Sequence, residues 1–317
     1  MRILTDQSTP AFPGERSIIT IGAYDGVHVG HQAVIDHVRR LAAERGCRSV
    51  LVTFDRHPAT IVRPESAPKL LTGPDQKLTR LEATGLDAVV MVHFDEGQAK
   101  ESPEAFVQRV LVDHLAVSAI VVGDDFHFGR GRDGNVDLLR KLGAEADFDV
   151  EPLELLARAD GVDEPVSSTA IRRALAGGDI TLANAMLGHT FEVRGDVVKG
   201  DQRGRLLGFP TANVEVSNRM CLPADGVYAG HYERPDGTIH DCAINLGRRP
   251  TFYEHAETSL LEAHILDFDG DLYGEKAIVR FSHFLRSERK FDGIDALIEQ
   301  LRADVESART LLIDSRD

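Results

Sequence analysis

The stretch IGAYDGVHVGH, residues 21–31, decides how the first half of the chain folds. An apolar run over residues 17–22 leads into it and predicts a β-strand. A run with one apolar face follows it as far as Gly46, which suits a helix C-cap, and predicts an α-helix. Small residues between the two let the backbone turn sharply and come close to a ligand; they are Gly22, Gly26 and Gly30.

The same alternation continues to about residue 153. The patterns predict five strands, over residues 17–22, 48–54, 87–93, 118–123 and 148–153. They predict further helices over residues 75–83, 102–114 and 135–142. Strand–helix–strand order with continuously apolar strands indicates an α/β domain, a Rossmann-like parallel sheet covered on both faces. Ligands of such a sheet gather at the carboxyl ends of its strands.

After about residue 187 the pattern changes to strands with no helices predicted between them. The strand candidates are residues 191–199, 211–216, 226–233, 239–245, 260–266 and 277–282. One apolar face then runs from Ile294 to Leu312 and predicts a closing helix. Six short strands and a terminal helix favour a small antiparallel β-barrel. We therefore expect two domains, residues 1–186 and 187–317.

Composition excludes several classes of function. The 317 residues carry a formal charge of −15, which argues against a nucleic-acid or acidic-membrane surface. No apolar run approaches the length needed to span a membrane, and the N-terminus lacks the apolar core of a signal peptide. Cys47, Cys221 and Cys242 are far apart and form no CxxC pair, so we expect reduced cysteines in a cytoplasmic protein. The oligomeric state is not readable from the sequence.

Two motifs suggest phosphate chemistry. His28 and His31 lie where the helix N-terminus offers unpaired N–H groups, and two imidazoles there can donate hydrogen bonds to a phosphoryl group during displacement. This predicts nucleotidyl transfer at an α-phosphate; a capping role is the alternative for a single histidine. The second motif is PVSSTAIRR, residues 165–173, which places three hydroxyls and an arginine at a helix start: Ser167, Ser168, Thr169 and Arg172. Such a set suits the β,γ-phosphates of a triphosphate, and an ordinary N-cap is the alternative.

Longer motifs then reveal a resemblance. In the first half they are GAYDGVHVGH (22–31), TFDRHP (53–58), VGDDFHFGRGRDG (122–134) and VSSTAIR (166–172). In the second half they are GRLLGFPTANV (204–214), DGVYAG (225–230), INLGRRPTF (244–252), LEAHILDFDGDLYG (261–274) and FLRSERKF (284–291). From end to end the chain resembles the prokaryotic bifunctional riboflavin kinase/FAD synthetase family. HxGH is shared by many nucleotidylyltransferases, whereas GFPTAN followed by DLYG is highly specific.

For the first domain the resemblance implies adenylylation of FMN by ATP, which gives FAD and pyrophosphate. It makes His28 and His31 catalytic. It implies nucleotide contacts from Gly22, Asp25, Gly30, Asp125, Ser167, Ser168, Thr169 and Arg172. It implies flavin contacts from Phe54, His57, Phe126 and Phe128, with loop packing an equal alternative for the last three. The chain departs from the family pattern at Tyr24 (usually Phe), Arg56 (usually Pro) and Asp125 (often Asn).

For the second domain the resemblance implies riboflavin kinase activity, the transfer of the γ-phosphoryl of ATP to the ribityl 5′-hydroxyl. Thr211 and Asn213 match the residues that hold Mg²⁺ on the nucleotide, an ion that prefers few protein oxygens besides phosphate and water. Glu262 matches the proposed base, on one strand face with His264. Gly200 and Gly208 suit a nucleotide-binding loop, with an ordinary turn an equal alternative for Gly200. Arg286 and Glu288 match a flavin-side RxE motif.

Two other interpretations remain open at this point. One is a nucleotidylyltransferase that acts on a different acceptor, such as phosphopantetheine or a polyol phosphate, although such enzymes do not need GFPTAN and DLYG. The other is a flavin-binding sensor or carrier whose catalysis has decayed. We expect small-molecule partners, namely ATP, riboflavin and FMN, with FAD as product.

Overall fold

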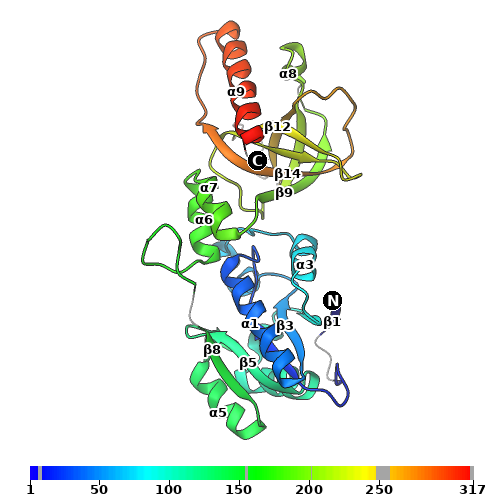
Figure 1. The fold of residues 1–317 in the computed structure, drawn as a ribbon, viewed down its shortest axis with the longest axis vertical. Coiled ribbons are helices and arrows are strands. Elements are labelled where there is room, and N and C mark those ends of the chain that lie inside the picture. Colours follow the sequence, from blue (N-terminus) through cyan, green and yellow to red (C-terminus); the bar gives the residue numbers. More distant parts are fainter. Residues whose placement is uncertain (6–8, 154–155, 201, 248–257, 315–317) are drawn as a thin grey trace. The chain divides into compact units, whose positions relative to one another are not determined.

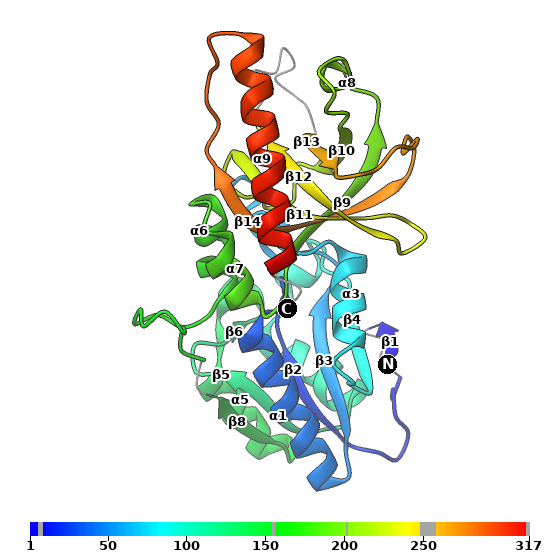
Figure 2. The ribbon, with the colours of Figure 1, turned by 45° about the horizontal axis from the view of Figure 1, so that its top comes forward.

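The computed structural model describes residues 1–5, 9–153, 156–200, 202–247 and 258–314. The chain divides into two compact units, Met1–Ser167 and Ser168–Asp317. Figures 1 and 2 show their elements from two sides. The domain boundary expected at residues 186/187 stays a prediction.

The first unit is built on a six-stranded sheet in the order β1-β4-β3-β2-β5-β8, and all its neighbouring strands are parallel. The strands are β1 (Arg2–Thr5), β2 (Ser17–Ile21), β3 (Arg48–Phe54), β4 (Ala88–Val92), β5 (Val117–Gly123) and β8 (Asp149–Leu153). The parallel sheet predicted from the sequence is confirmed. The edge strand β1 was not predicted; it pairs in register with β4, Arg2 opposite Ala88.

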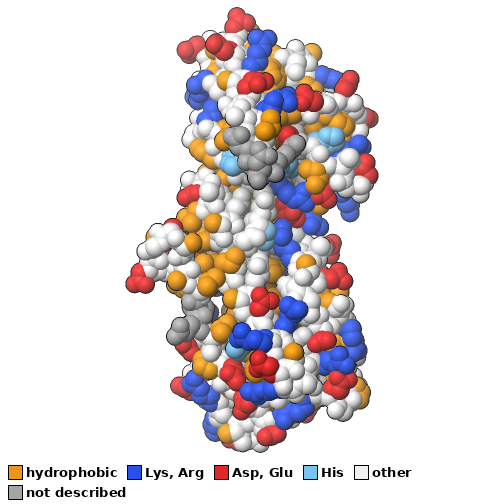
Figure 3. Space-filling view, viewed as in Figure 1, with side chains coloured by type: hydrophobic (Ala, Val, Ile, Leu, Met, Phe, Trp, Pro, Cys, Tyr) orange, Lys and Arg blue, Asp and Glu red, His pale blue; other side chains and the backbone are white. Residues whose placement is uncertain are grey.

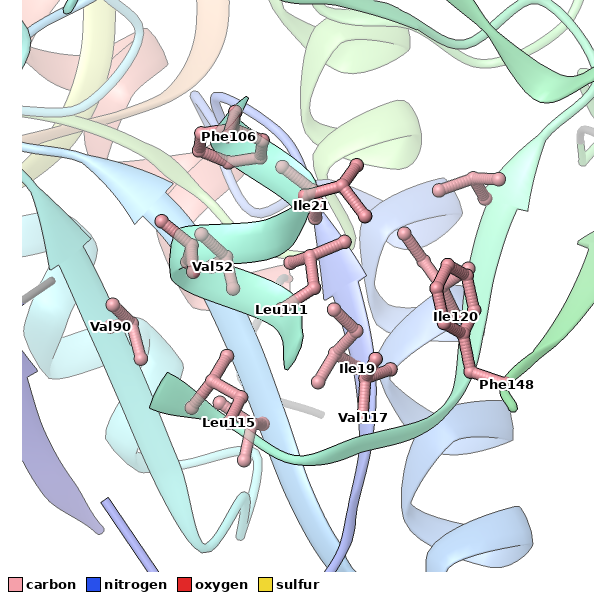
Figure 4. Packing of buried hydrophobic residues seen from close by; sticks show 14 of the residues in the cluster. Ile19, Ile21, Val52, Val90, Phe106, Leu111, Leu115, Val117, Ile120 and Phe148 are labelled. Carbon is pink, nitrogen blue, oxygen red and sulfur yellow. The ribbon is translucent and has the colours of Figure 1, made fainter. Parts of the chain in front are cut away.

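Apolar cores lie on both faces of this sheet because successive strand residues point to opposite sides. Ile19, Ile21 and Val52 pack on one face, where Leu111 and Phe148 come from the covering segments (Figure 4). Ile18 and Leu51 belong to a second cluster on the other face. The sheet is thus the middle of three layers, and its loops at the carboxyl ends are free to carry chemistry.

Helices on the two faces of the sheet make the outer layers. The helices are α1 (Val29–Arg45), α2 (Ala59–Val62), α3 (Pro74–Glu82), α4 (Pro103–Phe106) and α5 (Val136–Ala146), and short 3₁₀ turns lie at Pro64–Ser66, Gln98–Lys100 and Arg130–Arg132. The helix predicted over 102–114 begins as expected, with Ser102 accepting a hydrogen bond from the Ala105 N–H. It continues, however, as a π-helix, η3 (Val107–His114). A two-residue ladder, β6 (His127–Phe128) with β7 (Gly134–Asn135), follows β5.

The second unit is a closed barrel in the order β10-β13-β12-β11-β14-β9, and its neighbouring strands are antiparallel. The strands are β9 (Phe191–Val198), β10 (Ala212–Ser217), β11 (Gly226–Glu233), β12 (Ile239–Leu246), β13 (Thr258–Ile265) and β14 (Lys276–Arg286). The predicted barrel and its terminal helix α9 (Ile294–Asp314) are confirmed. The expectation of no intervening helix was wrong, because α8 (Arg203–Leu206) forms a single turn between β9 and β10.

Two further helices, α6 (Ser168–Ala176) and α7 (Ile180–Leu187), precede the barrel and belong to the second unit. Asn184 of α7 ties them to the barrel. Its amide donates to the Phe281 carbonyl of β14 at 2.9 Å and accepts from the Phe191 N–H of β9 at 2.8 Å. The sequence predicted a helix start at α6 but did not predict α7.

Candidate active sites

The turn after β2 sets His28 at the start of α1. His28 is the N-cap, and its Nδ1 accepts a hydrogen bond from the His31 N–H at 3.3 Å. An Nδ1 that accepts carries no proton, so the neutral ring is protonated on Nε2. His28 therefore does cap the helix, which is the role given above as the alternative for a single histidine. It also fixes the tautomer that makes Nε2 a hydrogen-bond donor.

His31 lies one turn into the helix against two rings. It stacks on His28 with centroids 3.6 Å apart and an interplanar angle of 18°, and the Tyr24 ring is 4.6 Å away. Its Nδ1 is buried and has no hydrogen-bond partner among the described residues. Burial lowers the pKa of His31 well below its ordinary value, and nearby His28 and Lys77 lower it further. The resting pair is thus a stack of neutral imidazoles with one buried nitrogen left for a ligand.

The loop that carries these rings is strained. Tyr24 and Val27 have positive φ angles of 50° and 42°, a conformation that L residues, and β-branched ones above all, adopt at a cost. Asp25 holds the loop in place, because its carboxylate accepts from the Leu71 and Thr72 N–H groups at 2.9–3.0 Å. Asp25 was predicted to contact nucleotide; its described bonds give it a structural role in the loop as well.

Charged groups gather beneath this loop around a small cavity of about 30 Å³, which has room for water but not for a nucleotide. The residues that line it are Ala23, Asp25, Asp55, Arg56, His57, Leu70, Thr72, Pro74 and Lys77. Predicted His57 is here, and its Nδ1 accepts from the Ala59 N–H at 3.2 Å. Lys77 was missed, because a lysine in an amphipathic helix is usually on the surface; here it is only 8% exposed.

The other predicted residues of the first unit lie in two places. Phe126 and Phe128 stack with centroids 5.5 Å apart, and exposed Asp125 precedes them in the turn after β5. Phe54, at the end of β3, makes an edge contact with Phe94 at 5.4 Å. Phe54 and the aromatic pair thus follow β3 and β5, the two neighbours of β2, at the same sheet edge as the histidines.

The serine- and arginine-containing motif spans the division between the units. Ser167 ends the first unit, while Ser168 and Thr169 begin α6 in the second unit and Arg172 lies one turn further along it. Their predicted role toward the triphosphate of the adenylylation site stays a prediction.

The barrel holds a cavity of about 450 Å³, large enough for a small molecule. Thr211 and Asn213, the predicted metal ligands, line it from the start of β10. The cavity also exposes polar groups that the sequence did not single out, namely Gln202, Arg205, Asp269, Asp271 and Tyr273. Four of them lie within the quoted motifs, Arg205 in GRLLGFPTANV and the other three in LEAHILDFDGDLYG, but without an assigned role.

Strand pairing brings the predicted kinase residues together. Asn213 of β10 is directly opposite Glu262 of β13, which is opposite Asn245 of β12. Glu262 is half-buried between fully buried neighbours, and His264 shares its strand face, as predicted. Glu262 does not line the cavity itself, but its strand partner Asn213 does.

Gly200 is placed against Asn213 more tightly than any other residue type would allow. A Cβ at Gly200 would lie 2.5–2.6 Å from three atoms of the Asn213 amide. Gly204 similarly lies against the Phe209 carbonyl. Gly208 has a φ of 85°, in the left-handed region that favours glycine. Close approach at Gly200, rather than flexibility alone, thus explains the glycine beside the candidate metal ligand.

Of the predicted flavin-side residues, Arg286 is the last residue of β14 and Glu288 follows it by two. Arg286 donates to Asp304 of α9 through two nitrogens, Nε to Oδ1 at 2.9 Å and Nη2 to Oδ2 at 2.7 Å. Asp304 is 4% exposed and also accepts from Gln300 at 2.6 Å. This buried pair fixes the end of β14 to the terminal helix. The Glu288 carboxylate lies where a side chain at Gly247 would have to be.

The donor set in the barrel cavity fits a magnesium ion that arrives with a nucleotide. Thr211, Asn213 and Asp271 all offer oxygen atoms. Among the residues the structure describes, no cluster of three or more His, Cys, Asp or Glu side chains is arranged to hold a metal by itself. Mg²⁺ characteristically takes one or two protein oxygens together with phosphates and water, which matches such a set.

Comparison with known proteins assigns each half of the chain. The FAD synthetase family model matches residues 13–170, and the riboflavin kinase family model matches residues 187–312. A bifunctional riboflavin kinase/FMN adenylyltransferase of Pseudomonas fluorescens is 40% identical over 298 residues, 94% of each chain. The protein of the same description from Listeria monocytogenes is 34% identical over 316 residues, 99% of this chain and 97% of its own.

A solved structure is also similar. A protein of Streptococcus pneumoniae described as a macrolide-efflux protein superposes with a TM-score of 0.85 at 27% identity, over 98% of this chain and 99% of its own. In the part of the present chain that the structure describes, no helix has both the length and the apolar character to cross a membrane.

Proposed function

The chain belongs to the family of bifunctional riboflavin kinase/FMN adenylyltransferases, and from this premise we propose how its residues divide the two reactions. The enzyme phosphorylates riboflavin to FMN with ATP in its C-terminal domain. It then adenylylates FMN to FAD in its N-terminal domain, with release of pyrophosphate. The observation that carries the residue assignment is the neutral His28–His31 stack, with the buried and unbonded Nδ1 of His31, at the carboxyl edge of a parallel sheet.

For adenylyl transfer, the FMN phosphate attacks the α-phosphorus of ATP, and negative charge builds on the oxygens of that group. We assign His28 and His31 to stabilise this charge. His28 offers the Nε2–H that its capping role fixes, and the N-terminus of α1 adds backbone N–H groups. The His31 pKa is lowered in the resting site, and the negative charge of a bound triphosphate would raise it, so that the ring can hold a proton toward the phosphoryl group.

For nucleotide and flavin binding in the first domain, we retain the residues expected from the family. Ser167, Ser168, Thr169 and Arg172 are assigned to the β,γ-phosphates. Gly22, Gly30 and Asp125 are assigned to the nucleotide, and Phe54, His57, Phe126 and Phe128 to the flavin. The position of Phe54 and the aromatic pair after the strands that flank β2 supports this assignment.

For phosphorylation of riboflavin, we propose that Thr211 and Asn213 hold Mg²⁺ through their side-chain oxygens. The ion would neutralise charge on the transferring phosphoryl group. Glu262, paired opposite Asn213, takes the proton from the ribityl 5′-hydroxyl, and the loop with Gly200 and Gly208 approaches the nucleotide. Arg286 and Glu288 are assigned to the flavin side.

We further propose that the enzyme acts in the cytoplasm on small molecules, without nucleic acid. Cys47, Cys221 and Cys242 are not joined by disulfides in the structure, which suits a reducing compartment. Acidic and basic side chains are interspersed on the face seen in Figure 3, and the net charge is −15. A broad basic surface of the kind that binds nucleic acid is therefore not seen on that face.

Product analysis with riboflavin, ATP and Mg²⁺ tests the residue assignment. His31→Ala should stop FAD formation and leave FMN formation nearly intact. Glu262→Gln should do the reverse when FMN is supplied. Equal loss of both products in His31→Ala would contradict separate sites, and full kinase activity in Glu262→Gln would reject Glu262 as the base. Removal of Mg²⁺ with a chelator should abolish FMN formation.

A further inference from the structure

The least expected charge in the first unit is the ammonium of Lys77. Lys77 is in α3 and is only 8% exposed. Its Nζ donates to the Phe54 carbonyl at 2.9 Å, to Thr53 Oγ1 at 3.2 Å and, more weakly, to the Ala23 carbonyl at 3.4 Å. Thr53 Oγ1 also donates to the Ala23 carbonyl, at 3.2 Å. These three hydrogen bonds of the ammonium therefore all go to neutral oxygens.

Burying an ammonium costs free energy, because the charged form loses its hydration. The place where Lys77 makes its bonds therefore calls for an explanation. Lys77 joins three segments: the end of β3, the helix α3 and the loop after β2 that carries the two histidines. That loop contains Tyr24 and Val27 at positive φ, so it holds its shape only if surrounding bonds fix it. The Ala23 carbonyl, immediately before the strained Tyr24, is where Lys77 and Thr53 both bind.

The charged neighbours of Lys77 favour its charged form only partly. Asp25 in the loop and Asp55 after β3 raise its pKa, but burial is the larger effect and lowers the pKa of Lys77 to about 8. Lys77 also interacts electrostatically with His31 on α1, because its positive charge is one of the causes that lower the His31 pKa. Arg56 and His57 share the small cavity with it. Lys77 thus changes charge near physiological pH while it is bonded to the loop that holds the histidines.

We infer that Lys77 is a positioning residue for adenylyl transfer: its buried ammonium, bonded to the Phe54 and Ala23 carbonyls, fixes the strained loop that leads to His28 and His31. This inference rests on the proposed role of His28 and His31. It adds to that role a residue in contact with the loop rather than with the reacting atoms.

The test compares Lys77→Met and Lys77→Arg with Lys100→Met, a matched control whose side chain is 76% exposed. Lys77→Met should lower kcat for FAD formation tenfold or more, while FMN formation by the same chain is unchanged. The His31 imidazole, followed by NMR, should titrate at higher pH in Lys77→Met. In wild type, kcat/KM for FAD formation should fall above pH 8. Lys77→Arg stays charged and should keep its rate to higher pH.

Several outcomes would overturn the inference. It fails if Lys77→Met matches Lys100→Met in FAD formation, or if its rate falls while the His31 titration is unchanged. If Lys77→Met does not fold, Lys77→Arg decides: an alkaline limb identical to that of wild type would refute the role. His31→Ala separates this inference from the proposed function. If His31→Ala keeps FAD formation, the assignment of the histidines fails; if only the Lys77 variants behave like wild type, the Lys77 inference alone fails.

Discussion

Replacement of Gly200 by alanine is a sharp test of the kinase site, because one added methyl group acts directly on a candidate metal ligand. The new Cβ would be 2.5–2.6 Å from the Asn213 amide, whereas ordinary contacts begin at 3.4 Å. Either the amide or the glycine loop must therefore retreat by about 0.8 Å, and misplacement on the order of 1 Å at a reacting centre costs about 100-fold in rate. The atoms in the way belong to the side chain of Asn213, whose backbone is held by pairing on both sides of β10, so the amide is the group expected to rotate out of place.

We expect Gly200→Ala to lower kcat for FMN formation by about 100-fold, equivalent to about 2.7 kcal/mol of transition-state stabilisation. The assay follows FMN from riboflavin and ATP over a range of Mg²⁺ concentrations. FAD formation from supplied FMN serves as the internal control. Gly293→Ala is the matched variant, since a Cβ there meets no atom within 4 Å. If folded Gly200→Ala keeps the wild-type kcat and Mg²⁺ dependence, Asn213 is not the ligand or its position is unimportant.

Three further changes have defined outcomes. Asp304→Ala leaves the Arg286 guanidinium without its buried partner and should destabilise the second unit by about 3 kcal/mol in urea unfolding, with a loss of kinase activity. Unchanged unfolding would show that the pair is dispensable. Tyr24→Phe removes a buried 2.7 Å hydrogen bond to Thr20 and should cost about 1 kcal/mol, but the ring against His31 remains, so FAD formation should persist. Because the folded pKa of His31 is lowered, its contribution to stability is full above the ordinary value of 6.5 and is lost as pH falls from there toward the folded pKa. His31→Gln should flatten this loss in unfolding measured from pH 7.5 to 5; an unchanged slope would contradict the lowered pKa.

Local patterns made much of the fold predictable. Continuous apolar strands, helix caps and the change of pattern after residue 187 are properties of short windows, and the structure confirms the parallel sheet and the barrel. The HxGH turn was predictable for the same reason, because its glycine spacing and its strand–helix junction both lie within eleven residues. The strand β1 was missed because its partner β4 is more than eighty residues away and its own residues are mostly exposed.

The supporting residues of the sites were less predictable, since their roles depend on partners far along the chain. Lys77 looked like a surface lysine on an amphipathic helix; its burial comes from loops that end β2 and β3. Asp304 looked like one of many charges on α9 until Arg286, eighteen residues earlier, was seen to bind it. The Gly200 packing against Asn213 crosses from one loop to a strand, and no spacing rule in the sequence reports such a contact.

The closure of the barrel has a consequence for association. Within the described residues, each of its six strands has two hydrogen-bonded neighbours, so the second unit presents no open strand edge onto which another chain could add a strand. Any self-association or partner binding by this half must therefore use side chains, and amyloid-like stacking from it requires prior unfolding. The open sheet of the first unit differs: β8 carries Pro152, which blunts that edge, whereas β1 leaves its outer edge unpaired.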